Sequence, residues 1–223
     1  MLLALDTATR KIGIALYDGV EILHEAVWQS PFHHTVELSP AIVESLTRAK
    51  HSIDDVEAIG LTLGPGSYTG LRIGAAVAKG LAFARKLPLV AVSTFEVIAA
   101  GQPLEQDTQL AAVIEAGRSR LGVGWFRAGE QNWEASKDPE LLTPEQLSKK
   151  IRTPTVICGE LNADLRKLLG RKRKNAVLAS PASSLRRPAY LAELAWARWQ
   201  AGETDDPATL APIYLQTGAN IPA

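Results

Sequence analysis

One glycine-rich segment constrains the fold of this chain more than any other stretch, and it reads Gly64-Pro65-Gly66-Ser67-Tyr68-Thr69-Gly70-Leu71-Arg72-Ile73-Gly74. It follows a strand-like apolar run at 56–63 and precedes a helix-like run at 68–85. A turn of this kind can present backbone N–H groups and a helix N-terminus to a phosphate. Because glycine has no Cβ, the same turn also lets two backbones approach closely. The choice between these uses decides most of the predicted function.

The composition excludes several classes of protein. The 223 residues carry 24 basic and 24 acidic side chains, which argues against a chain that holds nucleic acid mainly through its own phosphate contacts. The single cysteine, Cys158, allows no intramolecular disulfide and argues against a cysteine-based metal site. The first residues lack the basic segment of a signal peptide, and no apolar run is long enough to span a bilayer. We therefore expect a cytoplasmic protein without membrane association.

The first half of the sequence predicts an α/β lobe with the order three strands, helix, strand, helix, strand, helix. The expected strands are 2–5, 12–17, 20–28, 56–63 and 89–92, and the expected helices are 35–50, 68–85 and 95–100. Ser39-Pro40 leaves the start of the first helix open. Either Ser39 caps a helix that begins at Pro40, or Pro40 lies inside a longer, kinked helix.

The second half restarts the pattern after a polar break at 101–108. The expected strands are 110–114, 121–126, 156–158 and 177–178, and the expected helices begin at 144, 162 and 188. We expect residues 1–101, rejoined by the C-terminal segment 207–223, to form the first lobe. Residues 102–206 are expected to form a smaller, diverged second lobe.

The glycine segment fits known nucleotide-binding loops poorly. A phosphate-binding P-loop needs lysine after its second spaced glycine, where this chain has Leu71. A dinucleotide-binding loop needs an acid at the end of the following strand, where this chain has Val92-Ser93-Thr94. The close-approach use is therefore favoured.

The predicted helix at 68–85 carries two stripes of residues. The small stripe repeats every four residues and consists of Gly70, Gly74, Ala78 and Ala82. The apolar stripe consists of Ile73, Val77 and Leu81. Because small residues let a second helix approach closely, we expect the small stripe to face another subunit and the apolar stripe to face the chain's own sheet.

Three segments together resemble the bacterial TsaB (YeaZ) family: residues 3–9, the glycine segment, and the tail Pro212-Ile213-Tyr214-Leu215. The likeness covers nearly the whole first lobe, whereas the second lobe matches loosely, as at Ile114-Glu115-Ala116-Gly117-Arg118. Asp6-Thr7-Ala8-Thr9 also resembles the first phosphate loop of the actin, sugar-kinase and heat-shock ATPase superfamily, which usually reads Asp-x-Gly-Thr/Ser. The resemblance implies two actin-like (ASKHA, ribonuclease H-like) lobes, with mixed sheets flanked by helices.

The resemblance implies a non-catalytic subunit of the tRNA threonylcarbamoyl transferase complex. In that family the TsaD subunit is catalytic and binds metal and nucleotide, an ATPase, TsaE, joins the pair, and tRNA is modified at the adenosine beside the anticodon. The resemblance further implies that this chain binds TsaD through first-lobe helices and forms a homodimer when alone. It would contact tRNA only indirectly, through the complex. ATP and metal are expected on partner subunits only. The expected interface residues are His34, Gly66, Tyr68, Thr69, Gly70, Arg72, Gly74, Ala78 and Ala82.

The catalytic features of the superfamily are reduced in this sequence, so no catalytic residue and no metal ligand is predicted. The His-x-x-x-His metal pattern is missing, because Leu38 stands four residues after His34. Asp6, Thr7 and Thr9 remain as vestigial phosphate-loop candidates. In the second lobe, Glu115 is a longer acid than the loop pattern wants, and Glu160 would repel a phosphate.

Two alternatives stay open. A nucleotide-dependent transferase or kinase acting alone is motivated by Asp6 and Glu115. A peptidase acting on TsaD is motivated by the glycoprotease label that relatives have carried, although nothing in the sequence places a base beside Ser67. The basic run Arg171-Lys172-Arg173-Lys174 is interpreted as a solvated helix end rather than a contact to the tRNA backbone.

Overall fold

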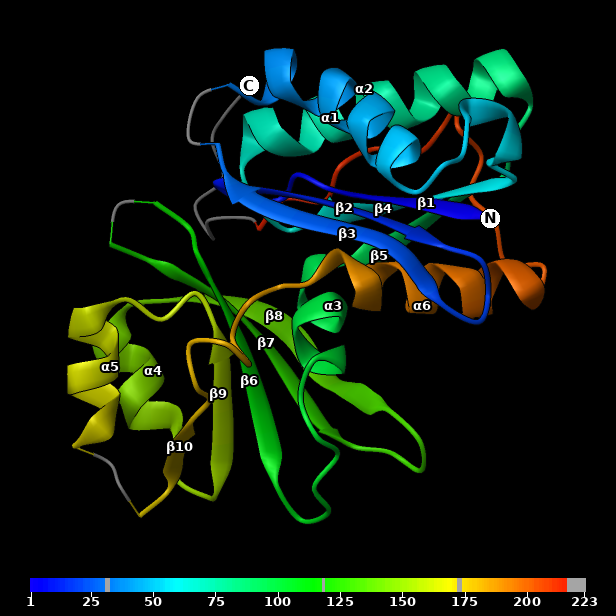
Figure 1. Ribbon diagram of the computed structural model, residues 1–223. Helices are drawn as coiled ribbons and strands as arrows, with labels where there is room; N and C mark the ends of the chain where they lie inside the picture. Colours follow the sequence, from blue (N-terminus) through cyan, green and yellow to red (C-terminus); the bar gives the residue numbers. More distant parts are fainter. Residues whose placement is uncertain (31–32, 118, 172–173, 216–223) are drawn as a thin grey trace. The chain divides into compact units, whose positions relative to one another are not determined.

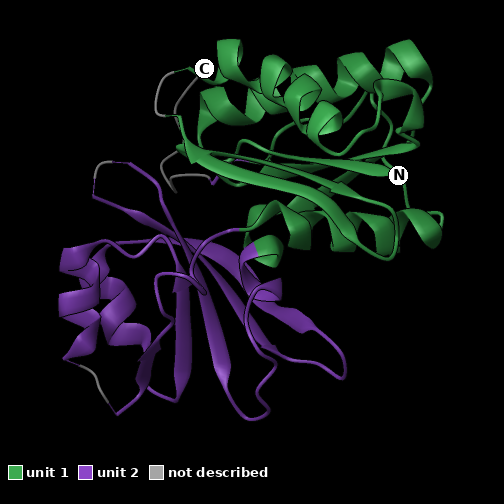
Figure 2. Cartoon of the chain, viewed as in Figure 1, with its two compact units in different colours: residues 1–97, 187–213 green, residues 98–186, 214–223 purple. Residues whose placement is uncertain are grey.

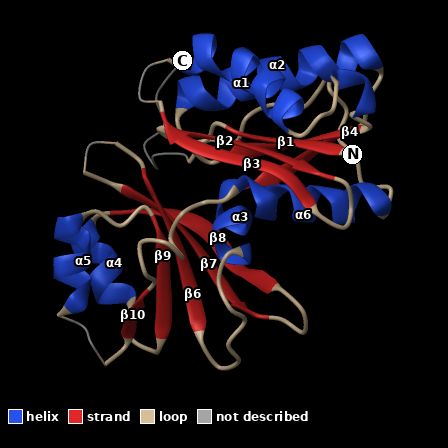
Figure 3. Ribbon diagram, in the orientation of Figure 1, coloured by secondary structure: helices blue, strands red, loops and turns tan. Residues whose placement is uncertain are grey.

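The chain forms two compact units, each built on one five-stranded mixed sheet with flanking helices (Figures 2 and 3). The computed structural model describes residues 1–30, 33–117, 119–171 and 174–215. Unit 1 consists of Met1–Val97 and Arg187–Ile213, and unit 2 consists of Ile98–Arg186 and Tyr214–Ala223. Within the described residues, none of the helices combines the length and the apolar character needed to cross a bilayer.

The sheet of unit 1 has the strand order β3-β2-β1-β4-β5. Its strands are β1 (Leu2–Asp6), β2 (Lys11–Tyr17), β3 (Ile22–Gln29), β4 (Ala58–Gly64) and β5 (Leu89–Ser93). The first three strands are antiparallel neighbours, whereas β4 runs parallel to both β1 and β5. Strands β1 and β4 are buried along their whole length, which explains why both appear in the sequence as unbroken apolar runs.

Helices cover both faces of this sheet (Figure 1). Helices α1 (His34–Arg48) and α2 (Tyr68–Arg85) lie on one face, and α6 (Pro188–Gln200) lies on the other. The core beneath α1 and α2 includes Leu3, Leu5, Ile14, Leu38 and Ile59. The core beneath α6 includes Leu2, Ala4, Val90, Leu191 and Ala195. The alternation of β1 between these two cores fixes its register, since a slip of one residue would exchange its faces.

Helix α1 begins before Pro40 rather than at it. The helix includes both Ser39 and Pro40, so the longer-helix alternative is the observed one. Trp28 on β3 donates its indole N–H to the carboxylate of Glu37 at 2.8 Å, which ties the first turn of α1 to the sheet edge. This hydrogen bond is the foremost cause that lowers the pKa of Glu37.

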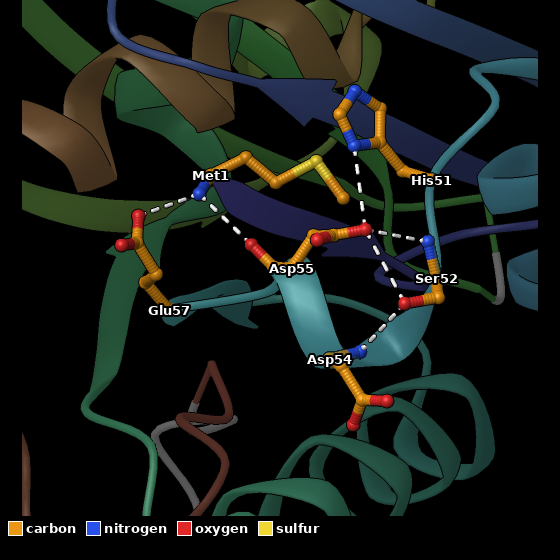
Figure 4. A network of polar contacts seen from close by, with 6 residues as sticks. All are labelled: Met1, His51, Ser52, Asp54, Asp55 and Glu57. Atoms are coloured by element: carbon orange, nitrogen blue, oxygen red, sulfur yellow. Dashed lines mark hydrogen bonds and ion pairs between the residues drawn. The ribbon is translucent and has the colours of Figure 1, made fainter.

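A polar network joins the end of α1 to the start of β4 (Figure 4). The short 3-10 helix η1 (Ile53–Asp55) is capped reciprocally, because Ser52 Oγ accepts from Asp54 N–H at 3.2 Å and the Asp55 carboxylate accepts from Ser52 N–H at 2.8 Å. The latter bond is the main cause that lowers the pKa of Asp55. The Met1 amine donates to the Glu57 carboxylate at 2.6 Å and to the Asp55 carbonyl oxygen at 3.0 Å. These contacts hold Met1, the residue before β1, beside the loop that leads into β4.

Unit 2 repeats the same succession of elements, with the strand order β10-β9-β6-β7-β8. Its strands are β6 (Gln109–Glu115), β7 (Leu121–Ala128), β8 (Trp133–Leu142), β9 (Thr155–Gly159) and β10 (Ala176–Leu178). Helices α4 (Pro144–Lys150) and α5 (Ala163–Gly170) pack on one face. The repeated order confirms the predicted pair of actin-like, ribonuclease H-like lobes. Strand β8 lies at the edge of the sheet and has mostly exposed side chains, and it was not among the expected strands.

The boundary between the units differs from the expected one. Helix α6 was expected in the second lobe, but Leu191, Ala192 and Ala195 pack on the first sheet. The first boundary between the units lies within helix α3 (Thr94–Ala100), after Val97, whereas it was expected after residue 101. The tail returns to unit 1 as far as Ile213, whose N–H donates to Leu63 O at 2.9 Å. Residues 216–223 of the expected C-terminal segment lie outside the described residues.

Candidate functional site

The glycine-rich turn packs directly against the loop that joins β1 to β2. Ser67 N–H donates to the carbonyl oxygen of Ala8 at 2.6 Å, and Ser67 Oγ accepts from Gly70 N–H at 3.3 Å as the helix N-cap. A Cβ at Gly66 would overlap the Ala8 carbonyl oxygen. The glycines therefore serve a close approach between two backbones of the same chain.

The small stripe of α2 faces into unit 1, so its expected role as a partner surface is wrong. A Cβ at Gly70 would overlap the carbonyl oxygen of Thr7, and a Cβ at Gly74 would overlap Thr7 Oγ1. Ala78 and Ala82 are buried in the core. The physical reason is that small residues allow α2 to lie directly on the β1–β2 loop and the sheet. Gly66, Gly70, Gly74, Ala78 and Ala82 thus contact their own chain. The apolar stripe Ile73, Val77 and Leu81, expected to face the sheet, is only partly buried.

His34 also lies inside the unit instead of on a partner surface. Its Nε2 is 3.0 Å from the carbonyl oxygen of Thr9, and the residue is buried. The contact links the first residue of α1 to the β1–β2 loop, so the expected interface role of His34 is corrected to a role in local packing.

The exposed side of α1 and α2 carries a group of apolar residues that we call the α1–α2 surface: Val36 and Val43 on α1, and Tyr68, Ala76 and Phe83 on α2. Val36 is 67% exposed and Phe83 is 86% exposed. The expected interface residues Thr69 and Arg72 are exposed on the same helix, and the Arg72 guanidinium lies 4.0 Å from the centre of the Tyr68 ring. Exposed apolar side chains on neighbouring helices are typical of a protein-binding surface.

The phosphate-loop candidates in unit 1 are engaged within the chain. Asp6 is buried, and its Oδ1 accepts from Ala8 N–H at 3.0 Å and from Thr62 Oγ1 at 2.9 Å. Thr7 Oγ1 donates to the Gly70 carbonyl oxygen at 2.8 Å. The buried Thr9 is held at the end of the same loop through its carbonyl contact with His34. Asp6, Thr7 and the Ala8 carbonyl oxygen are therefore all engaged in hydrogen bonds within the chain.

The corresponding loops of unit 2 carry acids that bind the chain itself. Glu115 N–H donates to Glu160 Oε2 at 2.9 Å, and Asn162 Nδ2 donates to Glu115 Oε1 at 3.3 Å. A Cβ at Gly159 would overlap the Val113 carbonyl oxygen, so this glycine also serves a close backbone approach. Arg118 lies outside the described residues. Across the described ranges, no three His, Cys, Asp or Glu side chains gather closely enough to hold a metal ion.

The thiol of Cys158 is expected to be unreactive in the folded protein. Cys158 lies buried in β9, and burial raises its pKa to about 12. At pH 8 its thiolate fraction is then about 10⁻⁴, against about a quarter for an ordinary thiol. Modification by dithionitrobenzoate should therefore be on the order of 1,000-fold slower in the native chain than in urea. Rapid native labelling would contradict this and would reopen a nucleophilic role for Cys158.

Comparisons with known proteins give a consistent result. The family model for tRNA N6-adenosine threonylcarbamoyltransferase, TsaD, matches residues 29–168. The tRNA threonylcarbamoyladenosine biosynthesis protein TsaB of Escherichia coli K12 is 32% identical over 68% of this chain and 66% of the relative, slightly less than two thirds of its length. TsaB of Haemophilus influenzae is 30% identical over 96% of this chain and 93% of the relative. The solved structure of YeaZ from Pseudomonas aeruginosa is 29% identical, with a TM-score of 0.78 over 96% of this chain and 99% of that structure.

Proposed function

The chain belongs to the TsaB family, and on this premise we propose that it is a non-catalytic cytoplasmic subunit of tRNA threonylcarbamoyladenosine biosynthesis. In this proposal its α1–α2 surface binds a TsaD-type catalytic subunit. The single observation that supports it best is the group of exposed apolar side chains on two neighbouring helices of unit 1, which includes Val36 and Val43 on α1 and Phe83 on α2. Burying such side chains against a partner is the main favourable contribution to association.

The family comparison supports a TsaD-type subunit as the partner. The TsaD model matches residues 29–168, a range that includes both α1 and α2. A TsaD-type subunit would then present an equivalent pair of helices, and two such pairs can pack face to face. The small exposed residues Ala76 and Gly80 between Tyr68 and Phe83 would let the helices approach closely. The same surface would pair two copies of this chain when TsaD is absent.

The chemistry is assigned to the partners in this proposal. The contacts of Asp6, Thr7 and Glu160 within the chain support a subunit that holds no nucleotide itself. ATP and metal would be bound by the TsaD-type subunit and a TsaE-type ATPase, and tRNA would be modified on TsaD.

Reconstitution tests this assignment. The chain is incubated with TsaD-type and TsaE-type subunits, tRNA, ATP and threonylcarbamoyl-adenylate, and the modified nucleoside is measured by mass spectrometry. We expect product only when TsaD is present, and a rise of at least about 10-fold when this chain is added.

Two outcomes would contradict the proposal. One is product formed by this chain without TsaD, and the other is stoichiometric ATP binding by the chain alone in calorimetry. Either would favour the nucleotide-dependent enzyme acting alone. Cleavage of TsaD by the chain would instead favour the peptidase.

A further inference from the structure

Unit 2 contains a pocket of about 550 Å³ that the proposed docking role does not use. Its lining residues come from β6, β7, β8 and the end of α4, and they are Gln109, Trp125, Ser136, Lys137, Lys150 and Arg152. Three of the six are cations, and none of the six belongs to the loops that resemble phosphate-binding loops. The pocket lies wholly within one unit, so its geometry is set by a single folded lobe.

The cations of the pocket outnumber its anions. Lys150 Nζ lies 2.7 Å from Glu140 Oε1, and Lys137 Nζ lies 3.1 Å from Glu140 Oε2, so two ammonium groups share one carboxylate. Among the residues that the structure describes, the Arg152 guanidinium has no hydrogen-bonding or ion-pair partner. The cluster therefore keeps an excess of two positive charges around one pocket. An anion bound there would relieve their mutual repulsion.

Trp125 holds this arrangement in place. It is only 4% exposed, its indole N–H donates to Glu140 Oε2 at 2.7 Å, and Lys137 Nζ lies 4.3 Å from its ring centre. Burial acts to raise the pKa of Glu140, but the hydrogen bonds from Lys150, Lys137 and Trp125 outweigh it and lower that pKa. Glu140 is thus ionised at neutral pH, and the positions of both ammonium groups are fixed before any ligand arrives.

The charge of the whole unit favours an extended anion. Unit 2 carries 14 basic and 10 acidic residues, whereas unit 1 carries 10 basic and 14 acidic residues, so the neutral total hides two lobes of opposite sign. Next to the pocket, the side-chain amide of Asn175 donates to the Arg152 carbonyl oxygen at 2.8 Å. The preceding residue is the exposed Lys174, so positive charge continues beyond the pocket rim. A chain of phosphates matches this better than a single small anion.

We propose that this pocket binds a backbone phosphate of RNA, with Arg152, Lys150 and Lys137 as its cationic lining and the neighbouring phosphate beside Lys174. Contacts of this kind position an RNA without reading its sequence. All the lining residues belong to unit 2, and none of them is part of the α1–α2 surface.

The test is fluorescence anisotropy of a labelled RNA hairpin with the full chain at low salt. We expect the double variant Lys150→Gln/Arg152→Gln to bind about 10-fold or more weakly. We also expect the slope of log K against log salt to become shallower by about one to two. Glu140→Gln should bind more tightly, because it removes the only carboxylate of the cluster. Lys149→Gln is the matched control, since Lys149 is exposed on the same helix but does not line the pocket.

Two results would overturn the proposed RNA-binding pocket. Equal weakening by Lys149→Gln and Lys150→Gln would show a diffuse charge effect and overturn the pocket. Binding of adenosine monophosphate at the pocket, without binding of the hairpin, would assign it to a free nucleotide and overturn the RNA proposal. Failure here is distinguishable from failure of the docking role, because Lys150→Gln/Arg152→Gln changes no residue of the α1–α2 surface and should leave calorimetric binding of the TsaD-type subunit unchanged.

Discussion

Replacing Val43 with aspartate is expected to weaken binding of a TsaD-type subunit about 100-fold, which corresponds to about 2.7 kcal/mol. Val43 is 64% exposed in the free chain, so the new carboxylate stays hydrated there and the unfolding free energy should change by less than about 0.5 kcal/mol. In the complex the carboxylate would be enclosed by apolar side chains of both subunits. Its lost hydration would not be offset by a partner charge. Phe83→Asp should act in the same way from α2.

Calorimetric titration of the folded variants with the TsaD-type subunit measures this effect. Val20→Asp is the matched control, because Val20 is 86% exposed at the turn between β2 and β3 and lies outside the α1–α2 surface. Size-exclusion chromatography with light scattering on the same variants reports self-association. If Val43→Asp binds as tightly as the parent chain, or if Val20→Asp weakens binding equally, the α1–α2 surface is not the docking site.

Much of the first lobe could be predicted from its sequence because each strand and helix has a signal in its own residues. The central strands are unbroken apolar runs, and α2 is bounded by a glycine turn and by Lys86, which ends the helix in a left-handed conformation. Strand β8 was not predicted because its side chains are mostly exposed and many are charged, so it lacks an apolar pattern. Its backbone is held by pairing with β7 rather than by burial of its side chains. The cationic pocket could not be predicted either, since Lys137 on that strand meets Lys150 and Arg152 only after the unit folds.

The predicted orientation of the two α2 stripes was wrong for a different reason. Helical periodicity identifies residues that share a face, but it does not say what the face contacts. The small residues mark the closest approach, and here the nearest neighbour is Thr7 of the same unit. The sequence does contain a signal for this. The β1–β2 loop places Thr7 directly after the buried strand β1, and Gly70 and Gly74 are the residues of α2 that lie against Thr7.

Replacing Gly70 with alanine is expected to destabilise unit 1 by about 3 kcal/mol, near the upper end for overpacking, because the new Cβ would overlap a backbone oxygen of Thr7. Neither the helix nor the loop can yield without breaking the bond from Thr7 Oγ1 to the Gly70 carbonyl oxygen. The midpoint of thermal unfolding should fall by roughly 6–12 °C. Gly80→Ala is the control in the same helix. In the described part of the chain a Cβ there would meet no neighbour within 4 Å, and greater helix propensity should stabilise by about 1 kcal/mol.

Substitutions at Gly74 distinguish packing within the chain from docking of a partner. The atom that a Cβ at Gly74 would overlap is Thr7 Oγ1, a side-chain atom that a second substitution can remove. Gly74→Ala should destabilise because its Cβ would overlap Thr7 Oγ1, and Thr7→Ala should cost about 1 kcal/mol through the lost hydrogen bond to Gly70. The double variant lacks the obstructing oxygen, so it should be more stable than the sum of the single effects by about 1–2 kcal/mol. A stripe that faced a partner would behave in the opposite way. Gly74→Ala would then leave unfolding unchanged and weaken only the binding of the TsaD-type subunit, and Thr7→Ala would not rescue it.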